Sequence, residues 1–231
     1  MDVLPRHAAD AVSNMSADLL LLEHYPSPQR VRLRTFAWSS PAYTFGVSQS
    51  WALYRARVPA ETALVRRCTG GGLVSHLHDW TFALVIPPGH PLFDLDAPSS
   101  YAVVQAAIHA ALAEQRQPVT LVPMPPQARA FRLPDDCARQ AEPHDLVRVD
   151  DGRKVAGAAQ KRNRHGLLIE GYVWRPFLPA CDWARFERVL VERLGEALAS
   201  PPVAVPAPIY EQVTYDETWA KFNSPEWNRR L

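Results

Sequence analysis

Three consecutive glycines, Gly70 to Gly72, follow two arginines and a cysteine and lead into an apolar segment. Glycine backbone adopts positive φ easily, and its N–H groups approach a ligand without interference from a Cβ atom. The flanking segments "ALVRRC" (63–68) and "WTFALVI" (80–86) predict two strands, so the glycines form a loop between them. Such a loop either binds an anion or a carbonyl oxygen or makes a tight turn or bulge in a sheet.

The glycine loop does not have the spacing of the common nucleotide-binding motifs. Neither Gly-x-x-x-x-Gly-Lys nor Gly-x-Gly-x-x-Gly is present around it. Arg66 and Arg67 precede the glycines, and arginine beside such a loop favours a phosphate or carboxylate ligand.

The rest of the chain alternates helical and extended patterns. Apolar spacing predicts helices over residues 8–24, 99–115 (with Ser99 or Ser100 as N-cap), 182–199 and, as one or two short helices, 214–231. Further strands are expected at 31–38, 43–50, 145–149, 153–162 and 166–173, with a turn at 150–152. Six prolines in residues 118–144 exclude a long helix there. The pattern predicts one mixed α/β domain over residues 1–231, with antiparallel pairing in its second half.

Composition excludes several classes of protein. With 231 residues, 47% of them hydrophobic and 21% charged, and a net charge of +1, nothing in the bulk charge indicates a nucleic acid or a membrane surface as partner. The three cysteines form neither a disulfide framework nor a Cys-x-x-Cys metal site, so no metal is expected. Without a signal-peptide pattern or a long apolar run, the expected location is the cytoplasm.

Two separated motifs carry a resemblance to a known family. "RRCTGGGLVSH" resembles the Arg-Arg-x-x-Gly-Gly-Gly-x-Val-x-His signature of the biotin/lipoate protein ligase and octanoyltransferase family, and "GRKVAGAAQKR" resembles its second motif. The segments "NMSADLLLLEH", "FAWSSPAYTFGVSQ" and "SPEWNRR" are also similar to that family's pattern. The resemblance implies an α/β catalytic domain of the α+β type, a mostly antiparallel mixed sheet flanked by helices.

The same resemblance assigns roles to individual residues. Lys154 matches the motif lysine beside the acyl carbonyl, where an ammonium stabilises negative charge on oxygen; without the motif it would be read as a solvated lysine after a turn. His76 matches the signature histidine and either lines the site or acts as a base, unless it is simply a hydrogen-bonded histidine at a strand end. The expected wall of the acyl pocket consists of Arg66, Arg67, Gly70, Gly71, Gly72, His76, Gly157 and Ala158.

The family contains ATP-dependent ligases and ATP-independent transferases. The segment "CARQAEPHDLVRVDDGRKVAG" resembles the cysteine-dependent octanoyltransferase branch, in which Cys137 holds the place of the nucleophile. The chain also leaves no room for the accessory C-terminal domain that adenylating lipoate ligases commonly need. The resemblance therefore implies transfer of an octanoyl or lipoyl group from acyl carrier protein, through acyl-Cys137, to a lysine of a lipoyl-domain protein. This reading requires no cofactor, and a monomer is the family expectation.

Departures from the family pattern keep two alternatives open. Asp135 and Asp136 precede Cys137 and Ala138 replaces an aromatic residue, so Cys137 is also compatible with a loop cysteine that has no role. Glu170 stands where many members have histidine. An ATP- and Mg-dependent lipoate or biotin ligase, or an acyl-binding module without catalysis, would accommodate these departures. Cys68 and Cys181 are expected to pack rather than react.

Overall fold

One large mixed sheet forms the centre of the molecule. The computed structural model describes residues 1–124 and 141–230, and in these the strand order is β12-β1-β3-β7-β11-β10-β9-β8, with β2 beside β3. Strands β7, β11 and β10 pair antiparallel, whereas β1 and β2 lie parallel to β3. The strands are β1 (Asp2–Val3), β2 (His7–Ala9), β3 (Arg32–Trp38), β7 (Asp79–Ile86), β8 (Val119–Leu121), β9 (Leu146–Arg148), β10 (Lys154–Asn163), β11 (Gly166–Trp174) and β12 (Val203–Ala204).

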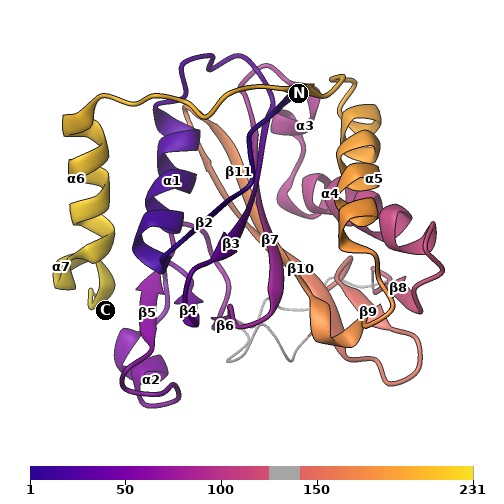
Figure 1. The fold of residues 1–231 in the computed structure, drawn as a ribbon, viewed down its shortest axis with the longest axis horizontal. Helices are drawn as coiled ribbons and strands as arrows, with labels where there is room; N and C mark the ends of the chain where they lie inside the picture. The colour runs from indigo at the N-terminus through magenta and orange to yellow at the C-terminus, as the bar shows by residue number, and fades with distance from the viewer. Residues whose placement is uncertain (125–140, 231) are drawn as a thin grey trace.

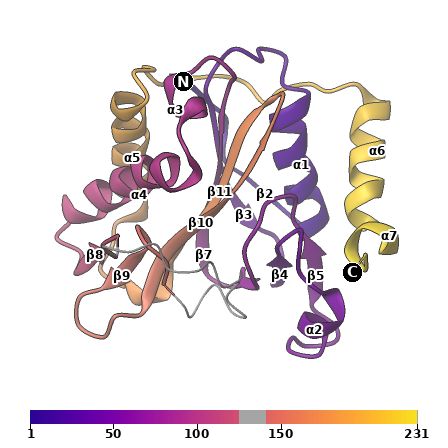
Figure 2. The same cartoon turned by 180° about the vertical axis from the view of Figure 1, so that it is seen from behind.

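Helices cover both faces of this sheet, and Figure 1 shows the two helical layers on opposite sides of it. The helices α1 (Ala11–Glu23) and α6 (Gln212–Asn223) lie on one side, while α4 (Ala97–Ala113) and α5 (Trp183–Ala197) pack together on the other. Figure 2 shows β10 and β11 crossing between these two layers. The short helices are α2 (Trp51–Arg55), α3 (Pro91–Asp94), a 3-10 turn η1 (Arg175–Phe177) and α7 (Pro225–Asn228).

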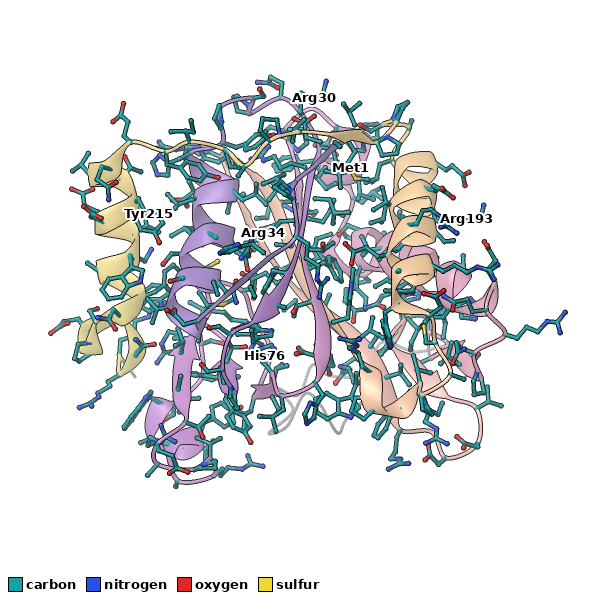
Figure 3. All side chains as sticks on the ribbon, in the orientation of Figure 1. Met1, Arg30, Arg34, His76, Arg193 and Tyr215 are labelled. Carbon is teal, nitrogen blue, oxygen red and sulfur yellow. The ribbon has the colours of Figure 1, made fainter. Side chains whose placement is uncertain are left out.

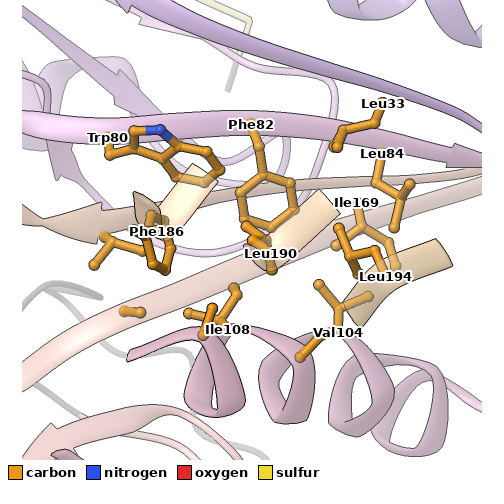
Figure 4. Packing of buried hydrophobic residues seen from close by; sticks show 14 of the residues in the cluster. Leu33, Trp80, Phe82, Leu84, Val104, Ile108, Ile169, Phe186, Leu190 and Leu194 are labelled. Atoms are coloured by element: carbon orange, nitrogen blue, oxygen red, sulfur yellow. The ribbon is translucent and has the colours of Figure 1, made fainter. Parts of the chain in front are cut away.

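Alternation along the central strands explains why the sheet has two buried faces. In β11, Leu167 and Ile169 belong to the core beneath α4 and α5, whereas Leu168 belongs to the core beneath α1. Successive strand residues point to opposite faces of a sheet. Apolar residues at consecutive positions therefore contribute to the cores on both faces. Figure 4 shows the α4–α5 side, where Trp80 packs edge-on against Phe186 with ring centroids 5.0 Å apart.

A second, three-stranded sheet carries the glycine loop. Its strands are β4 (Ala42–Phe45), β5 (Ala63–Arg66) and β6 (Val74–Ser75), in the order β5-β4-β6. Strand β4 lies between the other two and pairs parallel with β5 and antiparallel with β6. The loop of residues 67–73 connects β5, on one side of β4, to β6 on the other side. The glycines therefore bridge two strands of one small sheet beside the α1 face of the main sheet.

The predicted mixed α/β class is confirmed, and three local expectations need correction. Asp96, rather than Ser99 or Ser100, caps α4, because its side chain accepts a hydrogen bond from the Ser99 backbone N–H at 2.8 Å. The predicted strand over 43–50 ends at Phe45, and the short helix α2 follows it. Residues 214–231 contain two helices, the first of which begins earlier, at Gln212. None of the helices in the described part of the chain is long and apolar enough to cross a membrane.

Candidate functional site

A cavity of about 60 Å³ opens between α1, the small sheet and strands β10 and β11. Much of its surface comes from apolar side chains, among them Met15, Phe36, Trp38, Val74 and Phe82. The polar and small residues that complete its lining are Asp18, Thr44, Arg67, Gly71, His76, Thr81, Lys154, Ala158, Ala159, Glu170, Gly171 and Tyr172. A concave site with apolar walls and a few converging polar groups is the usual form of a small-molecule site.

Lys154 enters this cavity in a fixed position. Its Nζ atom lies 2.7 Å from Asp145 Oδ2, and the two side chains are only 6% and 1% exposed. Tyr101 donates its hydroxyl proton to Asp145 Oδ1 and accepts a hydrogen bond from the Ala158 N–H at 2.9 Å. Burial and the neighbouring Asp145 carboxylate raise the pKa of Tyr101 well above its ordinary value, so it remains a donor. Lys154 is a buried, oriented cation rather than a solvated residue after a turn.

Gly157 makes room for the lysine. A Cβ atom at this position would lie 2.5 Å from Lys154 Cε and 2.7 Å from its Nζ, closer than nonbonded atoms approach. The register of β10 and β11 places Gly157 opposite Tyr172 and Ala158 opposite Gly171, and three of these residues line the cavity. Lys154 and Ala158 of the second motif therefore lie at the cavity wall, whereas Gly157, expected there from the motif, lies behind it and contacts Lys154.

The glycine loop is held by Arg67. Its guanidinium donates to the Gly70 carbonyl at 2.6 Å, to the Gly72 carbonyl at 3.0 Å and to Thr44 Oγ1 at 3.2 Å. Gly71 has a φ of 87°, which favours glycine, and it is the member of the triplet that lines the cavity. The carbonyls of Gly70 and Gly72 turn toward the arginine instead.

Arg66 does not lie where the sequence motif predicted. Its guanidinium donates to the carbonyls of Val47 and Gln49, both at 2.7 Å, and to those of Trp227, Asn228 and Arg230 in the C-terminal segment. It is fully buried and does not line the cavity. The expectation that Arg66 forms part of the acyl pocket is corrected: the side chain fastens the C-terminal segment to β5, because five N–H donors match a cluster of carbonyls.

His76 belongs to a chain of hydrogen bonds along one cavity wall. Its Nδ1 lies 2.6 Å from Asp79 Oδ2 and its Nε2 lies 2.8 Å from Thr44 Oγ1, the hydroxyl that Arg67 also contacts. Trp38 stacks on the imidazole with ring centroids 3.9 Å apart. An imidazole protonated on Nδ1 satisfies both partners, since it donates to Asp79 and accepts from Thr44. Figure 3 shows His76 near the small sheet and Arg34 beside α1.

Two buried carboxyl groups face the cavity near α1. Asp18 pairs with Arg34 at 2.5 Å, and Glu170 accepts a hydrogen bond from the Thr69 hydroxyl. Burial raises the pKa of both carboxyl groups, and in Glu170 the nearby Asp18 raises it further. Glu170, which departs from the family histidine, is therefore a wall residue of the same cavity.

The three cysteines fall into different situations. Cys137, the predicted nucleophile, lies outside the described residues, so its role stays a prediction. Cys68 packs in the core beneath α1, where burial and Glu170 raise the pKa of its thiol well above the ordinary value. Cys181 is 8% exposed, and burial raises its pKa to about 11. Both thiols are free and buried, as the packing role predicted for them requires.

Several site residues were not singled out from the sequence. Asp145 and Asp79 orient Lys154 and His76, and Tyr101 on α4 reaches Asp145 from a distant part of the chain. The spacing of Asp79 three residues after His76 is a local signal that could have indicated the pair. Tyr101 and Asp18 gave no such signal, because their place in the site depends on helix packing. Among the described residues, no group of three or more His, Cys, Asp or Glu side chains could hold a metal ion.

The fold and the cavity define an α/β domain with a candidate small-molecule site between its small sheet and its main sheet. Residues 10–200 match the model of the lipoyl protein ligase A/B catalytic domain, and the chain belongs to that family. Among solved structures, a lipoate-protein ligase A bound with ATP has a TM-score of 0.77 at 16% identity, covering 99% of this chain and 97% of the other. A bi-partite lipoate protein ligase of Thermoplasma acidophilum, studied with its E2 lipoyl domain, has a TM-score of 0.73 at 16% identity, with 99% and 95% covered. These two structures share the fold.

Curated relatives give a more specific comparison. The chain is 29% identical over 175 residues to the octanoyltransferase LipM of Moorella thermoacetica, covering 74% of this chain and 63% of the relative. It is 22% identical over 260 aligned positions to the octanoyltransferase LipM of Kyrpidia tusciae, covering 95% of each. The match spans less than two thirds of the Moorella protein and about half, 53%, of a similar Exiguobacterium protein.

Proposed function

We propose that the protein is an acyltransferase of protein lipoylation, which moves an octanoyl or lipoyl group from a carrier thioester to a lysine of a lipoyl-domain protein. The observation that carries this proposal is the buried Lys154 ammonium, fixed by Asp145, at the wall of an apolar cavity. The likeness to octanoyltransferases supports acyl transfer as the reaction. Acyl carrier protein is the proposed donor, and the proposed location is the cytoplasm.

The chemistry consists of two acyl transfers. The thiolate of Cys137 attacks the carbonyl carbon of the donor thioester, a new C–S bond forms, and the carrier leaves as its thiol after taking a proton. The amine of the acceptor lysine then attacks the acyl-cysteine, an amide forms, a proton is lost from the amine and the Cys137 thiol is restored. In both steps negative charge develops on the acyl oxygen.

Lys154 is suited to stabilise that oxygen. An ammonium has three N–H donors, and Asp145 accepts one of them. The remaining donors are available to an acyl oxygen, in a buried site where charge–charge interactions are stronger than in water. Asp145 and Tyr101 are positioning residues in this scheme, because they hold the lysine and the adjacent strand without touching the acyl group.

The experiment is detection of an acyl adduct by intact mass after incubation with octanoyl-carrier thioester. We expect a hydroxylamine-sensitive adduct that disappears in Cys137→Ala and remains in Cys181→Ala, a matched change at a buried cysteine outside the cavity. A parallel reaction with lipoate and ATP tests the ligase alternative. An acyl-adenylate formed by a fully active Cys137→Ala variant would refute the transferase proposal, and the absence of both adduct and transfer would favour a binding module.

A further inference from the structure

Glu170 and Asp18 are two buried carboxyl groups in the lining of the cavity. In the β10–β11 register Glu170 lies opposite Ala159, whereas Tyr172 lies opposite Gly157. Gly157 is the glycine against which the Lys154 side chain packs. Residues two apart on a strand point to the same face and lie about 7 Å apart. Glu170 is therefore about 7 Å along β11 from Tyr172, the residue opposite Gly157. Asp18 reaches the same cavity from α1 and is fully buried. An acyl chain that begins at Lys154 and extends toward α1 places its distal carbons beside these carboxyl groups.

The hydrogen-bond partners of the two groups leave acceptor capacity on each of them. Arg34 Nη1 contacts Asp18 Oδ1 at 2.5 Å, but Asp18 Oδ2 has no hydrogen-bond partner among the described residues and is buried. Thr69 donates to Glu170 Oε2, while the partner of Glu170 Oε1 within the described part of the chain is the Cys68 thiol, a weak donor at 3.9 Å. A buried carboxylate oxygen without a donor is costly, so this end of the cavity is incomplete without a ligand atom or water.

The protonation state of Glu170 decides whether its carboxyl group can donate a hydrogen bond as well as accept one. Burial and the Asp18 carboxylate raise the pKa of Glu170 to about 7, while Thr69, Arg67 and Arg34 act in the opposite direction. A protonated Glu170 both donates and accepts a hydrogen bond, as a hydroxyl does. Arg34 balances one of the two carboxyl groups, so the second is satisfied either by its own proton or by a donor from the ligand.

We propose that Glu170, with Asp18, is the specificity-determining end of the acyl cavity and selects acyl chains that carry a hydrogen-bonding heteroatom near their distal end over saturated chains. The inference rests on the proposed acyl transfer and narrows its substrate. Of the two groups named there, the octanoyl chain ends in a methyl group, whereas the lipoyl chain carries sulfur at this end, a weak acceptor that pairs only with a protonated Glu170. A methyl group offers no hydrogen bond to the carboxyl oxygens at this end of the cavity.

Two probes that differ by one oxygen atom test this proposal. Octanamide and 8-hydroxyoctanamide are bound to the full-length protein and followed by calorimetry, with Glu170→Gln and Glu170→Leu as variants. We expect the wild type to bind 8-hydroxyoctanamide about tenfold more tightly than octanamide, because leaving a buried acceptor unsatisfied corresponds to roughly 5- to 150-fold in Kd. Glu170→Gln should keep the preference, since an amide also donates and accepts. Glu170→Leu should abolish or reverse it.

The outcomes separate this inference from the proposed reaction. Amides cannot be transferred, so the binding ratio is independent of Cys137, of the carrier and of ATP. Equal binding of the two probes by the wild type, or a preference for octanamide, would overturn the inference even if octanoyl transfer is observed. An unchanged ratio in Glu170→Leu would also overturn it, provided that the variant unfolds cooperatively. Failure of acyl transfer with a clear preference for the hydroxyl probe would overturn only the reaction.

Discussion

Lys154 Nζ lies 2.7 Å from Asp145 Oδ2, and the pair is buried although both residues come from a surface hairpin. Asp145 directly precedes β9 and Lys154 begins β10, so the antiparallel pairing of Lys154 with Val147 brings the two side chains together. Tyr101 closes the group from α4. One local turn therefore places a cation at the cavity, and a distant helix fixes its carboxylate partner.

Replacing Asp145 by Asn should leave the buried ammonium without its counter-charge. Breaking a buried pair in this way typically costs roughly 3–5 kcal/mol of unfolding free energy. Urea unfolding measures the loss, and acyl transfer should fall with it because Lys154 is no longer held. Asp151→Asn, which removes an exposed partner of Arg153 on the same hairpin, is the control and should change stability by less than about 1 kcal/mol. Equal effects of the two changes would contradict this account.

Gly157→Ala should affect transfer more than stability. The new Cβ would overlap Lys154 Cε and Nζ, the flexible end of a side chain that can move aside. Displacing the ammonium by about 1 Å from its position is expected to reduce kcat/KM about 100-fold. Steady-state transfer kinetics and the urea midpoint are measured on the same preparation. A variant with normal kinetics would show that the position of Lys154 is not needed.

Arg66→Lys should lower stability without changing recognition of the acyl group. Lysine cannot donate to five carbonyls, and each buried carbonyl left without a donor costs about 1–3 kcal/mol. Thermal unfolding should therefore begin earlier, whereas the Kd for octanamide should remain within about twofold at a temperature where the variant is folded. A stable variant that binds octanamide weakly would restore Arg66 to the acyl pocket.

Replacing Glu170 by Gln should stabilise the protein against unfolding more at alkaline pH than at acidic pH. The pKa of Glu170 rises from 4.5 to about 7 on folding, so folding takes up a proton between these values. Its contribution is therefore most favourable below about pH 4.5, decreases as the pH rises through about 7, and is constant above that. Urea unfolding at pH 5 and pH 8 should show a gain for the variant that is larger at pH 8. Glu217→Gln, at an exposed position of α6, should show no such difference.

Local patterns were sufficient for the elements and for half of the site. Apolar runs predicted β7 and β11, and the two motifs predicted that Lys154, Gly157, Ala158, Gly71 and His76 contribute to one site. Of these, the lysine, Gly71, His76 and Ala158 line one cavity. The short strands β1 and β12 were not predicted, because each consists of two residues that pair only with segments distant in the chain. The cap of α4 was misplaced, since Asp96 and the following Ala97-Pro98 start the helix before the serines.

The sequence by itself determined the type of fold and several of the residue types that line the cavity. Two adjacent arginines looked equivalent in the sequence, yet one anchors the C-terminal segment and the other holds the glycine loop. Only tertiary structure decided this, because Arg66 ends β5 and Arg67 begins the glycine loop, so the two side chains meet different neighbours. Tertiary structure also decides the carboxyl groups: burial raises the pKa of Asp18 and of Glu170, and the Asp18 carboxylate, brought close by packing of α1 on the sheet, raises that of Glu170 further.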